Sequence, residues 1–327
     1  MRRILLATTA ALTATLLAAP AVAPALAADA VAFDPVAPVA ADPVPQRSVL
    51  LGGGISVSPT YEGSDQYRVA PFPIFSYDSG TGIDGPRRFE FRGLDDIRLH
   101  ALRLGGLSLG PIAGYSFGRE EDEGDVLRGL GDVDGGLVLG GFVGYDVEVA
   151  PGATIGVDVG VSGQVTGDAF DDRAIAFAGL TLPVRRRIEE NYGYGYTVDF
   201  GVSGEFDLTP RLNLATRLGA EYASDEYMRT FFGVNQFQSD ASALAINGGT
   251  RVPVFGVGLD PRFADAIDGQ VKNVYLDTNL AFEATDRIEL RAGLGYSRLI
   301  GDAADSPISV SDDQFTGSLG AAYRFSF

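Results

Sequence analysis

The feature of this sequence that most restricts its fold is a series of segments in which apolar and polar residues alternate. Residues 196–208 place Tyr, Val, Phe and Leu at almost every second position, with Thr, Asp, Gly, Ser and Glu between them. Such alternation gives a β-strand one apolar and one polar face. The pattern returns at 137–149, 153–165, 210–222, 270–284 and 286–298. The chain is therefore predicted to be all-β.

The polar faces of these segments favour a membrane barrel over a soluble sandwich. They are rich in glycine and carry charges of both signs, while Tyr and Phe gather near the segment ends. A soluble β-sandwich also alternates, but a barrel in the outer membrane adds aromatic girdles at both interfaces and a polar lumen. After the N-terminal leader no run of eighteen apolar residues occurs, so helical spans are excluded. We predict a closed antiparallel transmembrane β-barrel.

A coarse count gives about twelve strands, within a range of ten to fourteen, and bacterial single-chain barrels have even numbers. Short links between strands, such as 207–210 and 284–286, are typical of tight turns and are expected to face the periplasm. Residues 173–190 and 250–258 fit either a further strand or an extended loop. The predicted strands are 48–58, 67–78, 86–93, 97–117 (one strand or two), 135–149, 153–165, 192–208, 210–222, 227–235, 270–284, 286–298 and 313–327.

The start of the chain predicts export. The opening MRR, the short apolar stretch after it and the Ala-Leu-Ala that ends at Ala27 are typical of a signal peptide over residues 1–27, cleaved before Ala28. Residues 28–47 are dense in Ala and Pro and are expected to form a flexible periplasmic tail. The barrel is expected over residues 48–327.

The last predicted strand has one aromatic face. Such a terminal row resembles the signal read by the outer-membrane assembly machinery, which is therefore an expected partner along with lipid and lipopolysaccharide. The residues of this expected assembly signal are Tyr323, Phe325 and Phe327.

Composition narrows the chemistry. The formal net charge of −18 argues against a nucleic-acid partner, because phosphate binding depends on Lys and Arg. The absence of cysteine excludes disulfides and thiolate metal sites. His100 is the only histidine, and no serine or carboxylate stands at a spacing that indicates catalysis, so we interpret it as a lumen residue. We expect no enzyme activity and no cofactor.

An acidic run offers the one candidate metal site. Oxygen ligands of this type bind Ca²⁺, but the run lacks the complete loop pattern with its distant Glu, so a solvated loop is favoured. The candidate ligands are Glu120, Glu121, Asp122, Glu123 and Asp125.

Charges on the polar faces predict a wet or salt-bridged lumen, since lipid rejects them. This leaves open a small channel as an alternative to a purely structural barrel. The predicted lumen charges are Arg211, Arg217, Glu221, Asp277, Arg287, Glu289 and Arg291.

Four segments carry a family resemblance. SPTYEGSDQYRVAPFPIFSY (58–77), GYSFGREEDEGDVLRGLGDVDGGLVLGGFVGY (114–145), YMRTFFGVN (227–235) and YSRLIGDAADSPI (296–308), with the terminal YRF, together resemble the MipA/OmpV family, the MltA-interacting proteins of the outer membrane. The resemblance implies an outer-membrane barrel in a Gram-negative bacterium and, for some members, a scaffold that links a murein transglycosylase to a murein synthase. Other members resemble porins or adhesins, and the family brings no catalytic residues.

The motif residues also have a physical interpretation. Turn formers stand between the first two strands, tyrosines are placed to flank the membrane interface, and a Gly-rich segment follows the acidic run. We expect these residues to serve folding and loop packing rather than ligand binding. They are Pro59, Tyr61, Gly63, Ser64, Asp65, Tyr67, Arg128, Gly129, Gly131 and Asp132.

Overall fold

The computed structural model describes most of the predicted barrel. The predicted signal peptide and tail, residues 250–258, Gly129 and Phe327 lie outside the described residues. Within the described part, no helix is both long enough and apolar enough to cross a membrane. The described residues are 48–78, 89–128, 130–167, 174–177, 180–183, 194–234, 238 and 268–326.

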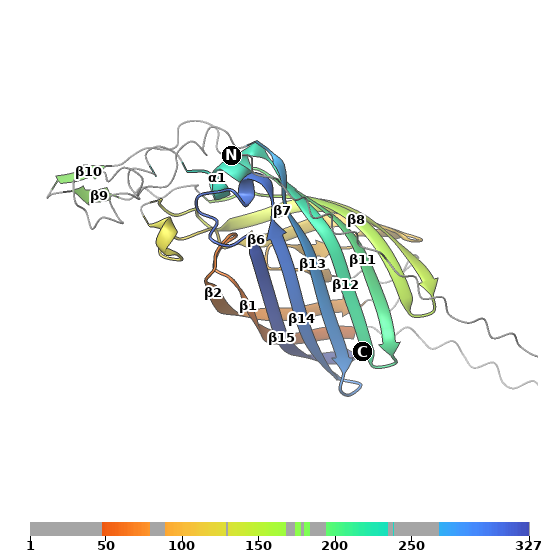
Figure 1. Cartoon of the computed structure of the whole chain (residues 1–327). Coiled ribbons are helices and arrows are strands. Elements are labelled where there is room, and N and C mark those ends of the chain that lie inside the picture. The colour runs from red at the N-terminus through yellow and green to blue at the C-terminus, as the bar shows by residue number, and fades with distance from the viewer. Residues whose placement is uncertain are drawn as a thin grey trace, which may run out of the picture. The chain divides into compact units, whose positions relative to one another are not determined.

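Antiparallel strands form one large sheet (Figure 1). A separate two-stranded sheet contains β9 (Ala174–Phe177) and β10 (Leu180–Pro183). The strands of the large sheet are β1 (Ser48–Pro59), β2 (Tyr67–Asp78), β3 (Phe89–Phe91), β4 (Ile97–Leu99), β5 (Leu102–Leu104), β6 (Leu107–Ser116), β7 (Gly136–Ala150), β8 (Ala153–Gln164), β11 (Thr197–Thr209), β12 (Leu212–Ala223), β13 (Gln270–Glu283), β14 (Ile288–Leu299) and β15 (Asp313–Ser326).

The sheet curves into a nearly closed barrel. Its strand order is β2-β1-β15-β14-β13-β12-β11-β8-β7-β6-β4-β3, with β5 also paired to β6, so twelve strands follow one another along the wall. The first and last long strands pair over ten positions, from Ser48↔Ser326 to Val57↔Gly317. The two ends of the path approach each other where the rings of Phe75 in β2 and Phe89 in β3 lie 5.6 Å apart. The predicted fold class, an antiparallel barrel of about twelve strands, is confirmed.

The two ends of the barrel differ in their connections. Short turns join β5 to β6, β7 to β8, β11 to β12 and β13 to β14, and we call this the turn end. Longer connections join β1 to β2, β6 to β7, β12 to β13 and β14 to β15, and we call this the loop end. Figure 1 shows α1 (Asp225–Phe232) at the loop end, opposite the β13–β14 turn.

The outer face of the wall is an apolar belt. Leucines and valines in the middle of long strands are largely exposed, with Leu294 at 74%, Val69 at 68% and Leu319 at 62%. A soluble protein rarely leaves so much contiguous apolar surface in water, whereas a membrane barrel turns it toward lipid. The belt therefore follows from the alternation in sequence, because every second residue of each strand points outward.

One predicted strand is wrong. Residues 227–235 were expected to add a strand, but Asp225–Phe232 forms the helix α1. Ser224 caps the helix by accepting a hydrogen bond from the amide of Tyr227, and Asp225 and Glu226 place negative charge at its N-terminus. The wall still has twelve strands, because the predicted segment 97–117 forms two neighbouring strands rather than one. These are β6 and, beside it, β4, with the short β5 also paired to β6.

Candidate functional site

The loop end is closed by an interlock of four connections, 60–66, 117–135, 224–234 and 300–312. Each of these connections contributes apolar side chains to a single buried cluster. Leu127, Val234 and Ile308 are fully buried in it. Because the segments are far apart in sequence, only the closed wall brings them together. The buried members are Tyr61, Leu127, Leu130, Val234 and Ile308.

Side chains fasten the interlock to backbone carbonyls of other connections. The Tyr61 hydroxyl donates to the carbonyl of Ile308 at 3.1 Å, Arg119 Nη1 donates to Phe231 at 3.0 Å, and Ser306 Oγ donates to Phe232 at 2.7 Å. Burial raises the pKa of Tyr61 to about 12 and lowers the pKa of Arg119 to about 10. Both shifts reflect side chains held away from water within the interlock.

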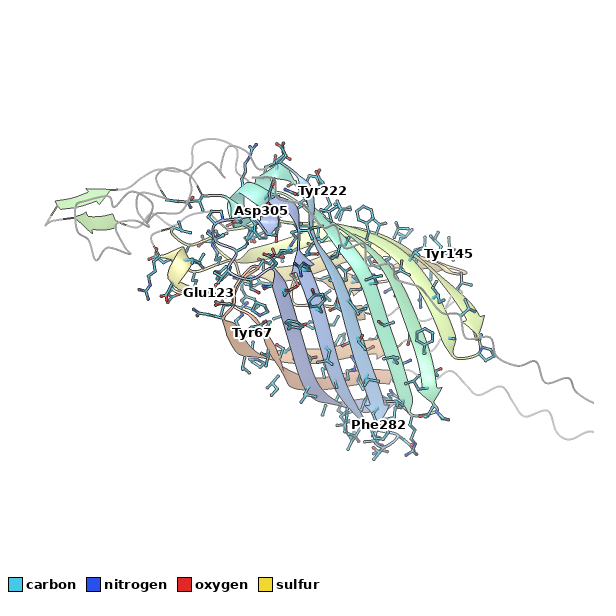
Figure 2. The ribbon with its side chains drawn as sticks, in the orientation of Figure 1. Tyr67, Glu123, Tyr145, Tyr222, Phe282 and Asp305 are labelled. Carbon is cyan, nitrogen blue, oxygen red and sulfur yellow. The ribbon has the colours of Figure 1, made fainter. Side chains whose placement is uncertain are left out.

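The order of the strands places this interlock across the mouth of the barrel. Between the β1–β2 and β6–β7 connections lie six strands of the wall in one direction and two, β3 and β4, in the other. Tyr61 and Leu127 nevertheless belong to one buried cluster. Connections from distant parts of a closed wall meet only over its opening, so the interlock covers the lumen at the loop end. Figure 2 shows Tyr67, Glu123, Tyr222 and Asp305 at this end and Phe282 at the other.

The helix α1 is a second apolar contact of the loop end. Its Met228 and Phe232 are fully buried against Ala223 at the end of β12, Leu299 at the end of β14 and Ala303 in the short 3-10 helix η2 (Gly301–Ala303). Each aliphatic or aromatic side chain buried in this way stabilises the fold by about 1.5–3 kcal/mol. The helix thus ties the β12–β13 connection to the β14–β15 connection.

Beneath the interlock lies a buried cluster of charge that we call the loop-end node: Glu62, Glu221, Tyr227 and Lys272. Lys272 Nζ lies 2.5 Å from Glu62 Oε1, 2.9 Å from Glu221 Oε2 and 3.4 Å from the Tyr227 hydroxyl. The Tyr227 hydroxyl in turn donates to Glu62 Oε2 at 3.0 Å. Burial, and then the neighbouring Glu62, raises the pKa of Tyr227 above its ordinary value. The node joins the β1–β2 connection, β12, β13 and α1.

A β-bulge aims Lys272 into the node. Glu221 pairs with Asn273 and Tyr222 pairs with Val271, so Lys272 is an extra residue on β13. Lys272 and Asn273, adjacent in sequence, are both buried, while Val271 and Val274 on either side are exposed. Bulges at barrel rims commonly redirect a side chain in this way. The sequence signal was the pair of polar residues that interrupts the alternation, and our sequence interpretation missed it, together with Glu62.

A second group of charges, the mid-barrel network, lies on the inner face of the wall. Its arginines come from β4, β12 and the β3–β4 turn, and its acceptors from β8, β11 and β13. Arg98 Nη1 lies 2.7 Å and Arg92 Nη1 lies 3.1 Å from Asp158 Oδ1. Arg217 bridges Asp158 and Asp199. The members are Arg92, Arg98, Asp158, Asp199, Arg217 and Tyr275.

Some other residues on the inner face are not paired in this way. Thr316 of β15 and Asn279 of β13 face the lumen, on the same side of the sheet as Asp277, and both are exposed. These short polar side chains line water-accessible space next to the network. Among the described residues, the inner face therefore combines a paired charged network with exposed polar side chains.

A third group, the turn-end cluster, contains Glu283, Glu289, Arg291 and Arg324. Arg324 lies 2.6 Å from Glu283 and 2.9 Å from Glu289, and Arg291 lies 2.6 Å from Glu289. All four residues stand on the neighbouring strands β13, β14 and β15, on their inner face.

Not every predicted lumen charge lies in the lumen. Arg211 and Arg287 are in the turns β11–β12 and β13–β14, where both are exposed, because the strand after each turn begins two residues later than expected. Asp277 stays on the inner face of β13, paired in register with Arg217.

The acidic run is divided among separate partners. Glu123 lies 3.1 Å from Arg68, Asp125 pairs with Arg128 at 2.8 Å, and Asp132 accepts a hydrogen bond from the amide of Glu121 at 2.9 Å. Burial raises the pKa of Glu123. Among the described residues no group of three metal-ligating side chains comes together, at this run or elsewhere. Glu120 and Asp122 lie with this run in the β6–β7 connection.

His100 lies inside the barrel wall. Its Nε2 is 3.0 Å from Glu90 Oε2, and its ring meets Phe142 edge-on with the centroids 4.9 Å apart. Only 4% of the residue is exposed. The imidazole is held by a carboxylate and an aromatic ring on the inner side of the wall.

The motif residues gather at the loop end. Ser64 is buried and its hydroxyl bonds to that of Thr60 at 2.8 Å, while Gly63 has a positive φ of 94° that disfavours a side chain. Gly131 likewise has a φ of 77°. Pro59 ends β1, and Asp65 and Tyr67 are exposed at the rim.

The aromatic row of β15 faces outward. Tyr323 and Phe325 are 37% and 48% exposed and their rings lie 4.7 Å apart. They belong to the apolar belt at the turn end.

Comparisons with known proteins agree with the sequence resemblance. The family described as MltA-interacting protein MipA matches residues 51–325. No curated protein matches the chain. Similar solved structures include the NanC porin, 8% identical over 84% of this chain and 98% of that one with a TM-score of 0.35. The outer membrane channel DcaP of Acinetobacter baumannii is 10% identical over 86% and 96%, with a TM-score of 0.34. At these scores the likeness carries no argument, and the fold rests on the strand pairing itself.

Proposed function

This chain belongs to the MipA family, because the family match covers most of its length, and from that premise we propose that it is an outer-membrane barrel of a Gram-negative bacterium that binds a murein transglycosylase of the MltA type. The apolar belt supports the membrane location, since it suits lipid on all sides of the wall. The role is one of binding rather than catalysis. A murein synthase as a second partner would make the chain a scaffold between the two enzymes.

The observation that carries this proposal is the interlock built from the family's own motif segments. Segments 58–66, 114–135, 227–234 and 296–308 meet over one mouth of the barrel. The motifs thus stabilise the closed loop end, and the turn end, with its exposed Arg211 and Arg287, is left as the surface for a periplasmic partner. Exposed charges at such a rim steer association and set partner choice.

Binding of a purified MltA-type transglycosylase to the full chain in nanodiscs tests the proposal. We expect saturable binding that the double substitution Arg211→Glu and Arg287→Glu weakens by roughly tenfold, mainly through slower association. Arg128→Glu, an exposed arginine at the loop end, is the matched control and should leave binding unchanged. Absence of binding, or equal effects at the two ends, would contradict the proposal.

A second candidate is a small solute channel, favoured by the exposed Thr316 and Asn279 on the inner face. Charged and polar inner walls conduct ions when water fills them. If the chain is a channel, the purified protein or a variant with an opened loop end should give discrete current steps in planar bilayers. If no variant with an opened loop end conducts, the channel candidate fails while the binding proposal stands.

A further inference from the structure

We propose that the interlock is a displaceable plug and that Glu62 is the latch that holds it on Lys272. The inference rests on the channel candidate above and adds the device that controls it. In this arrangement the β1–β2 connection closes the mouth as long as the carboxylate of Glu62 is bound to the ammonium group that the bulge in β13 presents.

Lys272 occupies an unusual position, at the bulge in β13. The ammonium group lies on the inner side of the wall, with its side chain 2% exposed, and only a bulge places it there. A regular β13 would alternate Lys272 to the lipid side, where an ammonium group is costly. The bulge therefore exists to hold a cation at the rim of the lumen.

Lys272 has two carboxylate partners, Glu221 and Glu62. Glu221 belongs to the wall itself, on β12 next to Lys272, and it remains beside the ammonium group in any position of the connections. Glu62 comes from a connection, and its contact is optional for the wall. Lys272 is thus satisfied twice, once permanently by Glu221 and once by a segment able to leave.

Glu62 is accessible to solvent, and the inner face of the barrel carries water-exposed polar residues. The Glu62 side chain is 38% exposed although it touches a buried ammonium group, so the latch opens to solvent at the loop end. Beneath the plug, Thr316 and Asn279 already border water on the inner face. Release of Glu62 would also remove the hydrogen bond that the Tyr227 hydroxyl of α1 donates to it, and so loosen the link between two of the four connections.

Single-channel recording in planar bilayers tests the latch through Glu62→Gln, which keeps the shape of the side chain and removes its charge. Because the charge-assisted contact with Lys272 is weakened, we expect the open probability to rise by roughly tenfold over the parent chain. The double substitution Glu62→Lys and Lys272→Glu restores one cation among the carboxylates and should return the channel to its closed state. Glu120→Gln, an exposed carboxylate of the β6–β7 connection, is the control that should change nothing.

The chain has no cysteine, which allows an independent readout in cells. A single Thr316→Cys should react slowly with a membrane-impermeant thiol reagent added outside the cells, and faster when Glu62→Gln is also present. Heat-dependent mobility on gels verifies that each variant is a folded barrel. If Glu62→Gln fails to fold, the charge-swapped double variant still tests the pairing, because a latch of this kind requires it to fold and stay closed.

Deletion of residues 301–311 separates the possible failures. If the deletion variant conducts but Glu62→Gln behaves like the parent chain, the latch is wrong and the channel candidate stands. If neither conducts, both are overturned. An open parent chain, or thiol labelling at the same rate with and without Glu62→Gln, also overturns the latch. Transglycosylase binding by Glu62→Gln, measured alongside, reports on the binding proposal alone and is expected to be unchanged.

Discussion

The loop-end node and the turn-end cluster both pair two glutamates with basic side chains but join different parts of the molecule. In the turn-end cluster, Arg324 and its partners stand on three neighbouring strands that backbone hydrogen bonds already hold together. In the loop-end node, Lys272 contacts Glu62, which is 210 residues away in sequence and lies in a connection outside the wall. The turn-end cluster lies on strands that are paired without it, whereas the loop-end node helps to hold the β1–β2 connection against the wall.

The cations of the two groups differ in burial, and Glu289 at the turn end, itself buried, keeps Arg291 as a partner when Arg324 is lost. The Lys272 side chain is 2% exposed and the Arg324 side chain is 33% exposed. Charges near water are screened and contribute little, while a buried charge that loses its partner is strongly unfavourable. The comparison therefore predicts that equal substitutions at the two ends have unequal effects.

The largest expected effect is that of Lys272→Met. It leaves Glu221 and the partly exposed Glu62 without their cation, and the free energy of unfolding should fall by about 3 kcal/mol. Arg324→Met, the matched change at the turn end, should cost at most about 1 kcal/mol. Urea unfolding of both variants in detergent micelles measures the difference, and equal losses would break the comparison.

Leu127→Ala tests the apolar part of the interlock. Leu127 is fully buried between connections, so its truncation should lower the free energy of unfolding by about 3 kcal/mol through lost burial and a cavity. Leu290→Ala, on the exposed outer face near the turn end, is the control and should change the stability in micelles far less. A negligible effect of Leu127→Ala would show that the connections do not pack on one another.

The raised pKa of Tyr61 makes the stability of the loop end depend on pH. Burial raises it from 10 to about 12, so the folded chain retains a proton that the unfolded chain loses. The corresponding stability is fully present below pH 10 and is lost as the pH rises from 10 to 12, by about 2 kcal/mol. Tyr61→Phe should remove this part of the pH dependence, as followed by unfolding at pH 9 and pH 12. An unchanged pH profile in the variant would contradict the burial of the phenol.

The smallest effect concerns the cap of α1. Ser224→Ala removes the acceptor of the Tyr227 amide and should cost about 1 kcal/mol. Ser224→Asp should keep the cap and most of the stability. Thermal unfolding of the two variants gives the measurement, and a Ser224→Asp variant as unstable as Ser224→Ala would indicate that the cap does not set the start of the helix.

The wall of the barrel could be predicted from sequence because its strands obey a local rule. Alternation alone placed Glu289 and Arg291 on the inner face and Leu290 on the outer one, and the bounds of β2, from Tyr67 to Asp78, agree with prediction. A period of two is decided by each residue and its near neighbours. The register errors at Arg211 and Arg287 occurred at turns, where that rule stops.

The loop end could not be predicted in the same way. The segment 227–235 has the apolar and aromatic content of a strand, and the capping Ser224 with Asp225 and Glu226 was the overlooked signal for a helix. The partners of Lys272 lie in segments whose proximity depends on closure of the whole wall. No local pattern specifies that Glu62 reaches Lys272, although the polar pair at 272–273 indicated a bulge.

Hydrogen exchange of backbone amides tests the central claim, the interlock over the loop end, most directly. The amides of Val310 and Ser311 donate to the carbonyl of Gly63 at 2.7 and 2.9 Å, and the amide of Arg119 donates to Val133 at 2.9 Å. The account predicts that these amides exchange far more slowly than those of exposed loops, and that Lys272→Met speeds them selectively. Exchange within seconds in the parent chain, as for exposed loops, would contradict it.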